Sequence, residues 1–171
     1  MRNLAQTPIS YFDKFKDKPV HIKPIDPSLV IISQDYRKKL KKILSDFNPE
    51  IVHRGSTAFG IAGKNEIELG VYPKQKDWQK IINLLTDHYG KVNNLEKNYA
   101  RFNDIYNGTE IEIILMKGYE ATLDKKLFSY LVSHPVLLNK YEKLKYKYCY
   151  SKKDYMIQKD KFFRNVIKNI P

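Results

Sequence analysis

Two segments of this sequence place glutamates at alternating positions between aliphatic residues. Glu66 and Glu68 lie in EIELGVYP, and Glu110 and Glu112 lie in TEIEIILM. Successive side chains of a β-strand point to opposite faces, so the two glutamates of each segment share a face. If the two strands are neighbours, like charges meet on one patch, which is stable when cations lie between them. Because ligand sets made of oxygen suit Mg²⁺ or Mn²⁺, we predict that these four glutamates bind metal and act in catalysis.

A Gly-Ser pair precedes the first acidic segment. Residues 57–65 separate Ser56 from the first glutamate. Glycine lets the backbone approach a ligand closely, and a serine hydroxyl donates a hydrogen bond. A helical turn that begins here would direct free N–H groups at phosphate. We therefore predict that Gly55, Ser56 and Thr57 bind phosphate beside the metal ligands, an arrangement suited to two-metal phosphoryl or nucleotidyl transfer.

Two basic residues lie close in sequence to these segments. Lys64 directly precedes the first acidic segment, and Arg101 precedes the second within the same hairpin. Both can neutralise the charge of a bound triphosphate. The alternative is that they are ordinary surface cations, just as alternating glutamates also occur on a strand face exposed to water.

The remaining pattern predicts an α+β protein with a mixed sheet flanked by helices. Apolar residues at helical spacing mark residues 34–47 and 76–90, and alternating runs flank the hairpin signal Asn107-Gly108. From residue 121 onward the pattern is helical, with a break at Pro135. We predict a single domain over 1–171 that consists of an irregular lead-in (1–30), an α/β core (31–118) and a helical tail (119–171).

The charge of the chain favours anionic partners. The 171 residues carry a formal net charge of +12. Residues 121–171 hold 11 lysines and one arginine against four acidic residues. Such a surface favours nucleotides or RNA, although a lysine-rich, solvated helical face is the alternative explanation.

The chain offers no sign of a membrane or secretory role. It has no long apolar run and no apolar signal segment near its start, and Cys149 is its one cysteine. An internal disulfide therefore cannot form, and we expect a cytoplasmic protein with no membrane partner.

Several segments together resemble the GrpB-like family of the nucleotidyltransferase superfamily. HRGSTAFGIAGK (53–64) is similar to the family's H-x-G-S-T-A-V-P-G-L-A-A-K, and LFSYLVSHPVLLNKYEKLK (127–145) to its F-R-D-Y-L-R-x-H-P-x-x-x-x-x-Y-x-x-L-K. DYMIQKDKFFRNV (154–166) is similar to its tail, where Lys159 takes the place of a late lysine. The spacing G-S, nine residues, E-I-E-L also resembles the superfamily signature. The chain departs from the family, which has one carboxylate after the loop and often H-x-H-x-V in the later strand.

The resemblance implies a metal-dependent nucleotidyltransferase. Such an enzyme transfers a nucleoside monophosphate from a nucleoside triphosphate, here expected to be ATP, to a hydroxyl acceptor. It also implies that Lys159 reaches the same pocket as the carboxylates. Two alternatives stay open: a non-catalytic nucleotide- or RNA-binding module on a degenerate nucleotidyltransferase fold, and an interaction domain that binds no nucleotide.

Overall fold

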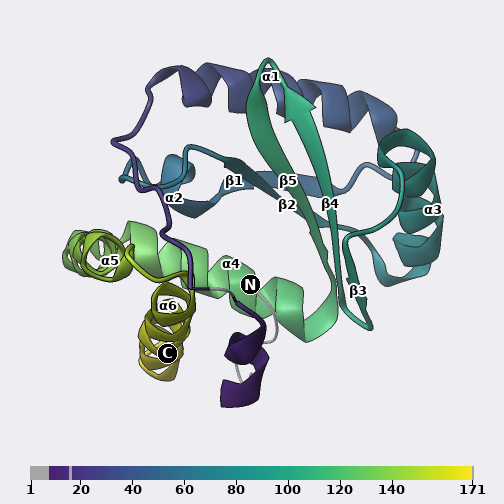
Figure 1. The fold of residues 1–171 in the computed structure, drawn as a ribbon. Coiled ribbons are helices and arrows are strands. Elements are labelled where there is room, and N and C mark those ends of the chain that lie inside the picture. The colour runs from purple at the N-terminus through teal and green to yellow at the C-terminus, as the bar shows by residue number, and fades with distance from the viewer. Residues whose placement is uncertain (1–7, 16, 171) are drawn as a thin grey trace.

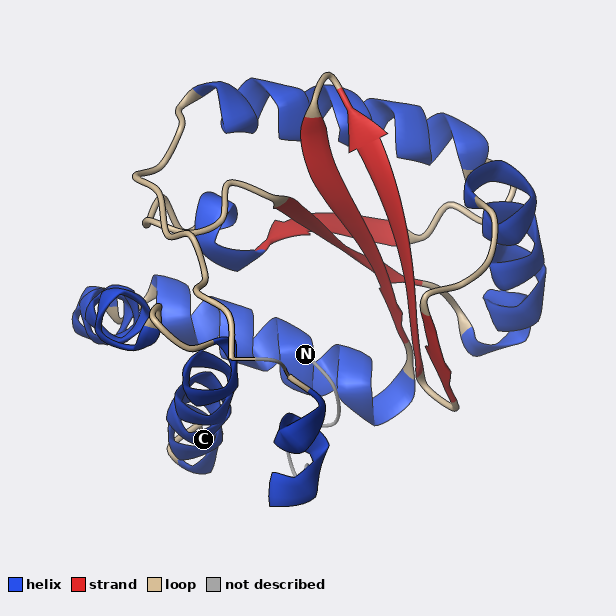
Figure 2. Cartoon of the chain, in the orientation of Figure 1, coloured by secondary structure: helices blue, strands red, loops and turns tan. Residues whose placement is uncertain are grey.

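The computed structural model describes residues 8–15 and 17–170, so parts of the predicted lead-in, residues 1–7 and 16, lie outside it, as does Pro171. Five strands form one mixed sheet in the order β1-β2-β5-β4-β3, flanked by helices, which confirms the predicted α+β class (Figures 1 and 2). The elements are η1 (Ile9–Lys14), α1 (Ser28–Ile43), β1 (Glu50–Arg54), α2 (Gly55–Ala58), β2 (Ile67–Tyr72), η2 (Gln75–Asp77), α3 (Trp78–Tyr89), β3 (Asn94–Glu96), β4 (Tyr99–Tyr106), β5 (Thr109–Met116), α4 (Gly118–Val132), α5 (Pro135–Tyr148) and α6 (Lys152–Lys168).

The region expected to be irregular contains helical structure in its described part. The short 3₁₀-helix η1 lies within it, and α1 begins at Ser28, earlier than the periodicity predicts. Asp26 Oδ1 accepts a hydrogen bond from the Ser28 N–H at 2.9 Å, and Pro27 has a φ of −58°, which suits a helix start. The expected core-facing residues Tyr36 and Leu40 of α1 are fully buried.

Alternation along the central strands separates two faces of the sheet. Ile67 and Leu69 of β2 are fully buried, as is Ile113 of β5, in a core that α1 and α3 cover. Tyr72 and Ile114 lie in a separate cluster on the other face, on the side of α4. Figure 1 shows α1 and α3 on one side of the sheet and α4 on the other. The glutamates at even positions of β2 and β5 therefore lie on the face away from the main core.

The predicted hairpin is present between β4 and β5. Asn107 has a φ of 50° and Gly108 a φ of 74°, as a type I′ turn requires at its two central positions. This turn fixes the antiparallel register in which Asn103 lies opposite Glu112. Strand β3 was not expected, because its three residues at the sheet edge carry no apolar alternation.

Three helices form the tail, and they have a core of their own. Leu127 and Leu131 of α4 pack with Tyr141 of α5 and Phe163 of α6. Pro135 occupies the first turn of α5, where its missing N–H costs nothing. Among the described helices, none combines the length and the apolarity needed to cross a bilayer.

Candidate functional site

Two carboxylates lie side by side on neighbouring parallel strands. Glu68 of β2 is the Cα partner of Glu112 of β5. Because residues opposite each other in register point to the same face, both side chains leave the sheet on the side away from the main core. The two acidic segments are thus neighbours, which meets the condition for a shared acidic patch.

The carboxylates line a cleft of about 480 Å³ that the sheet, η1 and α6 enclose. Its basic lining residues are Lys14, Lys64, Arg101, Lys152 and Lys159, and its acidic lining residues are Glu66, Glu68, Glu112 and Asp160. Positive and negative side chains are therefore nearly balanced in number. Such a cleft suits a ligand that brings both an anion and a cation, as a phosphate with a bound divalent metal does.

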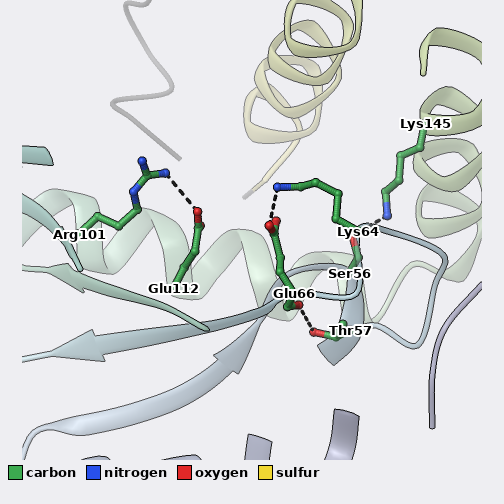
Figure 3. Close-up of polar contacts among 7 residues, drawn as sticks. All are labelled: Ser56, Thr57, Lys64, Glu66, Arg101, Glu112 and Lys145. Atoms are coloured by element: carbon green, nitrogen blue, oxygen red, sulfur yellow. Dashed lines mark hydrogen bonds and ion pairs between the residues drawn. The ribbon is translucent and has the colours of Figure 1, made fainter. Parts of the chain in front are cut away.

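Two of the cleft carboxylates are paired with cations that also line the cleft. Arg101 Nη1 donates to Glu112 Oε1 at 3.2 Å, and Lys64 Nζ donates to Glu66 Oε2 at 2.5 Å (Figure 3). The side chains of Arg101 and Lys64 are 36% and 45% exposed. Both cations therefore contact water, whereas the side chains of their partners Glu112 and Glu66 are only 21% and 13% exposed. The two cations are thus accessible to an incoming phosphate.

The pKa values of the cleft groups shift in different directions. Burial raises the pKa of Glu66, and Glu68 and Glu112 add to the rise, although Lys64 opposes it. Burial also acts to raise the pKa of Glu68, but the positive charges around it, with Lys159 the strongest, hold this pKa below its usual value. Burial disfavours the charge on Lys159, yet neighbouring tyrosines and carboxylates raise its pKa well above the ordinary value. The surrounding charges therefore favour the charged forms of both Glu68 and Lys159.

Gly55 lies directly against Glu68. Its φ is +74°, and a Cβ atom built on it would lie 2.5 Å from Glu68 Oε1. A side chain at this position would meet both an unfavourable backbone conformation and the carboxylate. Glycine at position 55 thus leaves room for Glu68 beside the turn that starts α2.

The hydroxyls predicted to bind phosphate are engaged inside the protein. Ser56 Oγ accepts a hydrogen bond from Lys145 Nζ at 2.5 Å. Thr57 is 4% exposed, and its Oγ1 donates to the Glu66 carbonyl at 3.2 Å and bonds the His53 ring at 2.9 Å. Both hydroxyls therefore hold the loop in place, and neither residue belongs to the described residues that line the cleft.

Helix α5 holds this loop through two side chains that the sequence analysis did not single out. Lys145 is fully buried, and its Nζ donates to the Ala62 carbonyl at 2.5 Å as well as to Ser56. Glu142 Oε1 accepts from the Ala62 N–H at 2.6 Å. Burial, with the nearby charge of Lys159, lowers the pKa of Lys145 to about 7. The available signal was YEKLK (141–145), a segment of the family resemblance that contains both residues.

The structure brings most of the predicted site residues together at the cleft. Those that line it are Lys64, Glu66, Glu68, Arg101, Glu112 and Lys159. Gly55, Ser56 and Thr57 form the adjoining turn. Glu110 is exposed near the start of β5, opposite Ile105, and is not among the described residues that line the cleft. Of the two glutamates in the second acidic segment, Glu112 is the one at the cleft.

The donor set suits a metal that arrives with a substrate better than a permanently bound one. Within 8–15 and 17–170, no group of three or more His, Cys, Asp or Glu side chains is arranged to hold a metal ion. Mg²⁺ is commonly bound through one or two carboxylates, with water and substrate phosphates as its other ligands. The neighbouring pair Glu68 and Glu112 meets that requirement.

The mixed sheet has acidic residues on adjacent strands, and a Gly-Ser turn precedes β2, as the resemblance to the nucleotidyltransferase superfamily predicts. A family model described as "GrpB protein" matches residues 19–169, so the chain belongs to the GrpB family, a member of the nucleotidyltransferase-like superfamily. The family expected from the sequence is thereby confirmed. A search of curated proteins returns no match to the chain.

Proposed function

We propose that the protein is a metal-dependent nucleotidyltransferase that uses a nucleoside triphosphate, with ATP as the first candidate. The observation that supports this function best is the pair Glu68 and Glu112, which are register partners on parallel strands and line the same cleft. Nucleotidyl transfer needs carboxylates that share a divalent cation with the substrate's phosphates. The GrpB family's place in the nucleotidyltransferase-like superfamily agrees with this chemistry.

The basic residues of the cleft bind the triphosphate in this proposal. Lys159 already lies close enough to Glu68 to shift its pKa, and Arg101 and Lys64 are ion-paired to the carboxylates on either side. When a triphosphate enters, Arg101 and Lys64 turn from these carboxylates to phosphate oxygens, which accept charge-assisted hydrogen bonds. Glu68 and Glu112 are then available to hold Mg²⁺ or Mn²⁺, which supplies charge neutralisation at the α-phosphate.

The proposed transfer is a single displacement at the α-phosphorus of the nucleotide. The acceptor hydroxyl oxygen forms a bond to the α-phosphorus, and the bond from that phosphorus to the bridging oxygen breaks, so pyrophosphate leaves with the electron pair. Glu112 accepts the hydroxyl proton, as a carboxylate within hydrogen-bond reach of the nucleophile can. Arg101 and Lys159 stabilise the charge that develops on the leaving pyrophosphate.

Calorimetric titration of ATP with and without Mg²⁺ tests the metal assignment. Glu68→Gln and Glu112→Gln remove one carboxylate charge each and keep the side-chain size. Glu110→Gln is the matched control, because Glu110 lies on the same strand but is exposed and outside the cleft lining. We expect the Mg²⁺-dependent gain in affinity to fall at least tenfold in both cleft variants and to stay unchanged in the control. Equal gains in all four proteins would contradict the proposal.

A transfer assay tests the reaction. The protein is incubated with ATP labelled at the α-phosphate, Mg²⁺ and a cell extract, and the extract is analysed for a labelled RNA, protein or small molecule. We expect label to be incorporated by the wild type and the Glu110→Gln control and not by Glu68→Gln. Incorporation that survives Glu68→Gln would show that another protein or another site performs the reaction.

A second function, nucleotide or RNA binding without catalysis, is favoured by one specific observation. Arg101 and Lys64 neutralise two of the cleft carboxylates, so the cleft is compatible with anions even without a metal. This function predicts binding that weakens steeply with added salt and persists after both Glu68→Gln and Glu112→Gln. The Mg²⁺ dependence in the proposed calorimetric titration separates the two functions.

A further inference from the structure

The cleft has chemically different walls. Its polar part lies on the sheet, where Glu68 and Glu112 line it together with Arg101. Another part consists of four rings, which come from η1, from Phe15 directly after η1 and from α6, and which we call the aromatic wall. Its residues are Tyr11, Phe12, Phe15 and Tyr155. Phosphate is bound by charge and hydrogen bonds, so aromatic rings do not contribute to a site that binds phosphate alone.

The rings of Tyr11 and Phe12 in η1 and of Phe15, which directly follows η1, form a single cluster. The centroids of Tyr11 and Phe15 are 5.9 Å apart with an edge-to-face angle of 76°, and those of Phe12 and Phe15 are 6.3 Å apart. Phe12 is 4% exposed, whereas Phe15 is half-buried. Phe12 therefore anchors the cluster, whereas Phe15 is partly exposed and lines the cleft, with Lys14 Nζ 5.4 Å from its ring centroid.

Backbone and ion-pair contacts hold this cluster in place against α6. The Lys152 N–H donates to the Lys18 carbonyl at 2.7 Å, and the Val20 N–H donates to the Cys149 carbonyl at 2.6 Å. Lys153 pairs with Asp13 of η1 at 2.8 Å. The segment after η1 is thus bonded to the turn between α5 and α6, so the aromatic wall is a built part of the cleft.

Helix α6 runs from the aromatic wall to the carboxylates. Tyr155 and Met156 line the cleft beside the rings of η1, and Lys159 lines it close to Glu68. Residues four apart share a helix face about one turn, roughly 6 Å, from each other. Lys152 Nζ lies 5.7 Å from the Phe15 ring centroid and adds positive charge at the aromatic end.

We propose that the aromatic wall is the base-binding subsite of the cleft, where Phe15 stacks on the base of the nucleoside triphosphate while its phosphates lie at Arg101 and Lys159. This inference deepens the proposed function and rests on its nucleotide substrate. Stacking on an aromatic ring tolerates every base, because every base has a π-face. The subsite therefore distinguishes a nucleoside triphosphate from bare polyphosphate, and it discriminates weakly between purine and pyrimidine.

Binding of three ligands to three proteins tests the subsite. ATP, UTP and inorganic tripolyphosphate are titrated, each with Mg²⁺, into the wild type, Phe15→Ala and Tyr146→Ala. Tyr146 provides the matched control, because it is 49% exposed on α5 and outside the cleft lining. We expect Phe15→Ala to weaken ATP and UTP by roughly tenfold and to leave tripolyphosphate unchanged. Tyr146→Ala should change none of the three affinities.

Phe15→Leu keeps the inference testable if Phe15→Ala loosens the segment around η1. Leucine preserves apolar contact with Phe12 but removes the π-face, so ATP should still bind severalfold more weakly than to the wild type. The thermal midpoint of each variant, compared with that of the wild type, reports any loss of folding.

The outcomes separate this inference from the proposed function. The subsite is overturned if the wild type binds ATP no more tightly than tripolyphosphate, or if Phe15→Ala weakens both ligands equally. If Phe15→Ala weakens ATP selectively but Glu68→Gln leaves the Mg²⁺ dependence unchanged, the subsite stands and the metal-dependent function fails. If no ligand binds the wild type, both are wrong.

Discussion

The two halves of the Gly-Ser and glutamate motif differ in what surrounds them. Glu68 lies on a strand, faces the cleft and has a second carboxylate, Glu112, beside it. Ser56 lies on a short turn, and its hydroxyl bonds Lys145 from a distant helix. Glu68 is therefore placed to contact a ligand, whereas the Ser56 hydroxyl stabilises the turn through an internal hydrogen bond.

Within one motif, the residues of the turn stabilise the site, and the residues of the strand are placed to bind a ligand. Gly55 has no side chain, and the absence of a Cβ atom leaves room for the Glu68 carboxylate. Ser56 and Thr57 contribute internal hydrogen bonds that fix the turn. The strand then presents its carboxylates from a rigid base, and the basic residues around them remain exposed enough to change partners. Substitutions in the turn should thus cost mainly stability, and substitutions on the strand should cost mainly binding.

The largest loss of stability should follow from removing Lys145. Lys145→Ala deletes a fully buried side chain and leaves the Ala62 carbonyl without its lysine donor, so we expect the free energy of unfolding to fall by about 2–4 kcal/mol. Lys145→Met keeps most of the volume and should lose less. Urea unfolding measures both variants. Wild-type stability in Lys145→Ala would show that α5 does not hold the turn.

Gly55→Ala should affect both halves of the motif. The positive φ costs roughly 1–2 kcal/mol in an alanine, and the new Cβ pushes Glu68 from its position. Gly108→Ala is the matched control, because Gly108 also has a φ of +74° but no heavy atom within 4 Å of a built Cβ. We expect both variants to lose stability and only Gly55→Ala to lose Mg²⁺-dependent ATP affinity. Equal affinity in the two variants would remove Gly55 from the site.

The pH dependence of stability should reveal the buried Lys145. Its pKa is about 7 in the folded protein and near 10.5 when unfolded, because burial disfavours the charge. At a pH between these two pKa values, Lys145 binds more protons in the unfolded chain than in the folded protein. This group therefore makes the free energy of unfolding rise with pH, by at most about 1.4 kcal/mol per pH unit. The charged groups that act on its pKa are Lys159, Glu142, Glu68 and Glu66, and its ammonium lies over the neutral ring of Tyr141.

Urea unfolding of the wild type and Lys145→Met at pH 6 to 10 measures this effect, and the variant corrects for the neighbouring groups. The difference in stability between the two proteins should shift in favour of the wild type above pH 7. Parallel pH profiles would mean that Lys145 keeps its ordinary pKa in the folded protein.

The smallest effect concerns the ion pair at the cleft. A double-mutant cycle on Arg101 and Glu112 should give a coupling below about 1 kcal/mol, since both side chains contact water. The control pair Lys38 and Asp35 has the same 3.2 Å distance with 74% and 50% exposed side chains, and it should couple still less. A coupling above about 2 kcal/mol would mark the Arg101 pair as structural and argue against its exchange for phosphate.

The sheet part of the site follows from local sequence. Alternation assigns Glu68 and Glu112 to one face, and Asn107-Gly108 fixes the hairpin that contains Glu112. These two expectations depend on neighbours along the chain, which a sequence displays directly. The adjacency of the two acidic strands had to be assumed, because β2 and β5 are far apart in the sequence.

The turn and the aromatic wall could not be predicted in the same way. The partner of Ser56 is a lysine 89 residues further along the chain, and no local pattern pairs them. The rings of η1 reach the cleft because the segment that follows crosses to the start of α6. The position of Glu110 was also undetermined, because strand alternation places it on the same face as Glu112 without showing where the cleft ends.

The central claim is that Glu68 and Glu112 hold a divalent cation together with a nucleoside triphosphate. A crystal structure of the protein with Mn²⁺ and a non-hydrolysable ATP analogue tests it directly, because Mn²⁺ is located by its anomalous scattering. We predict an anomalous peak in contact with both carboxylates and the phosphates, with the Arg101 guanidinium moved from Glu112 to a phosphate. A nucleotide bound in the cleft with no Mn²⁺ at this pair, and with the Arg101–Glu112 ion pair intact, would contradict the account.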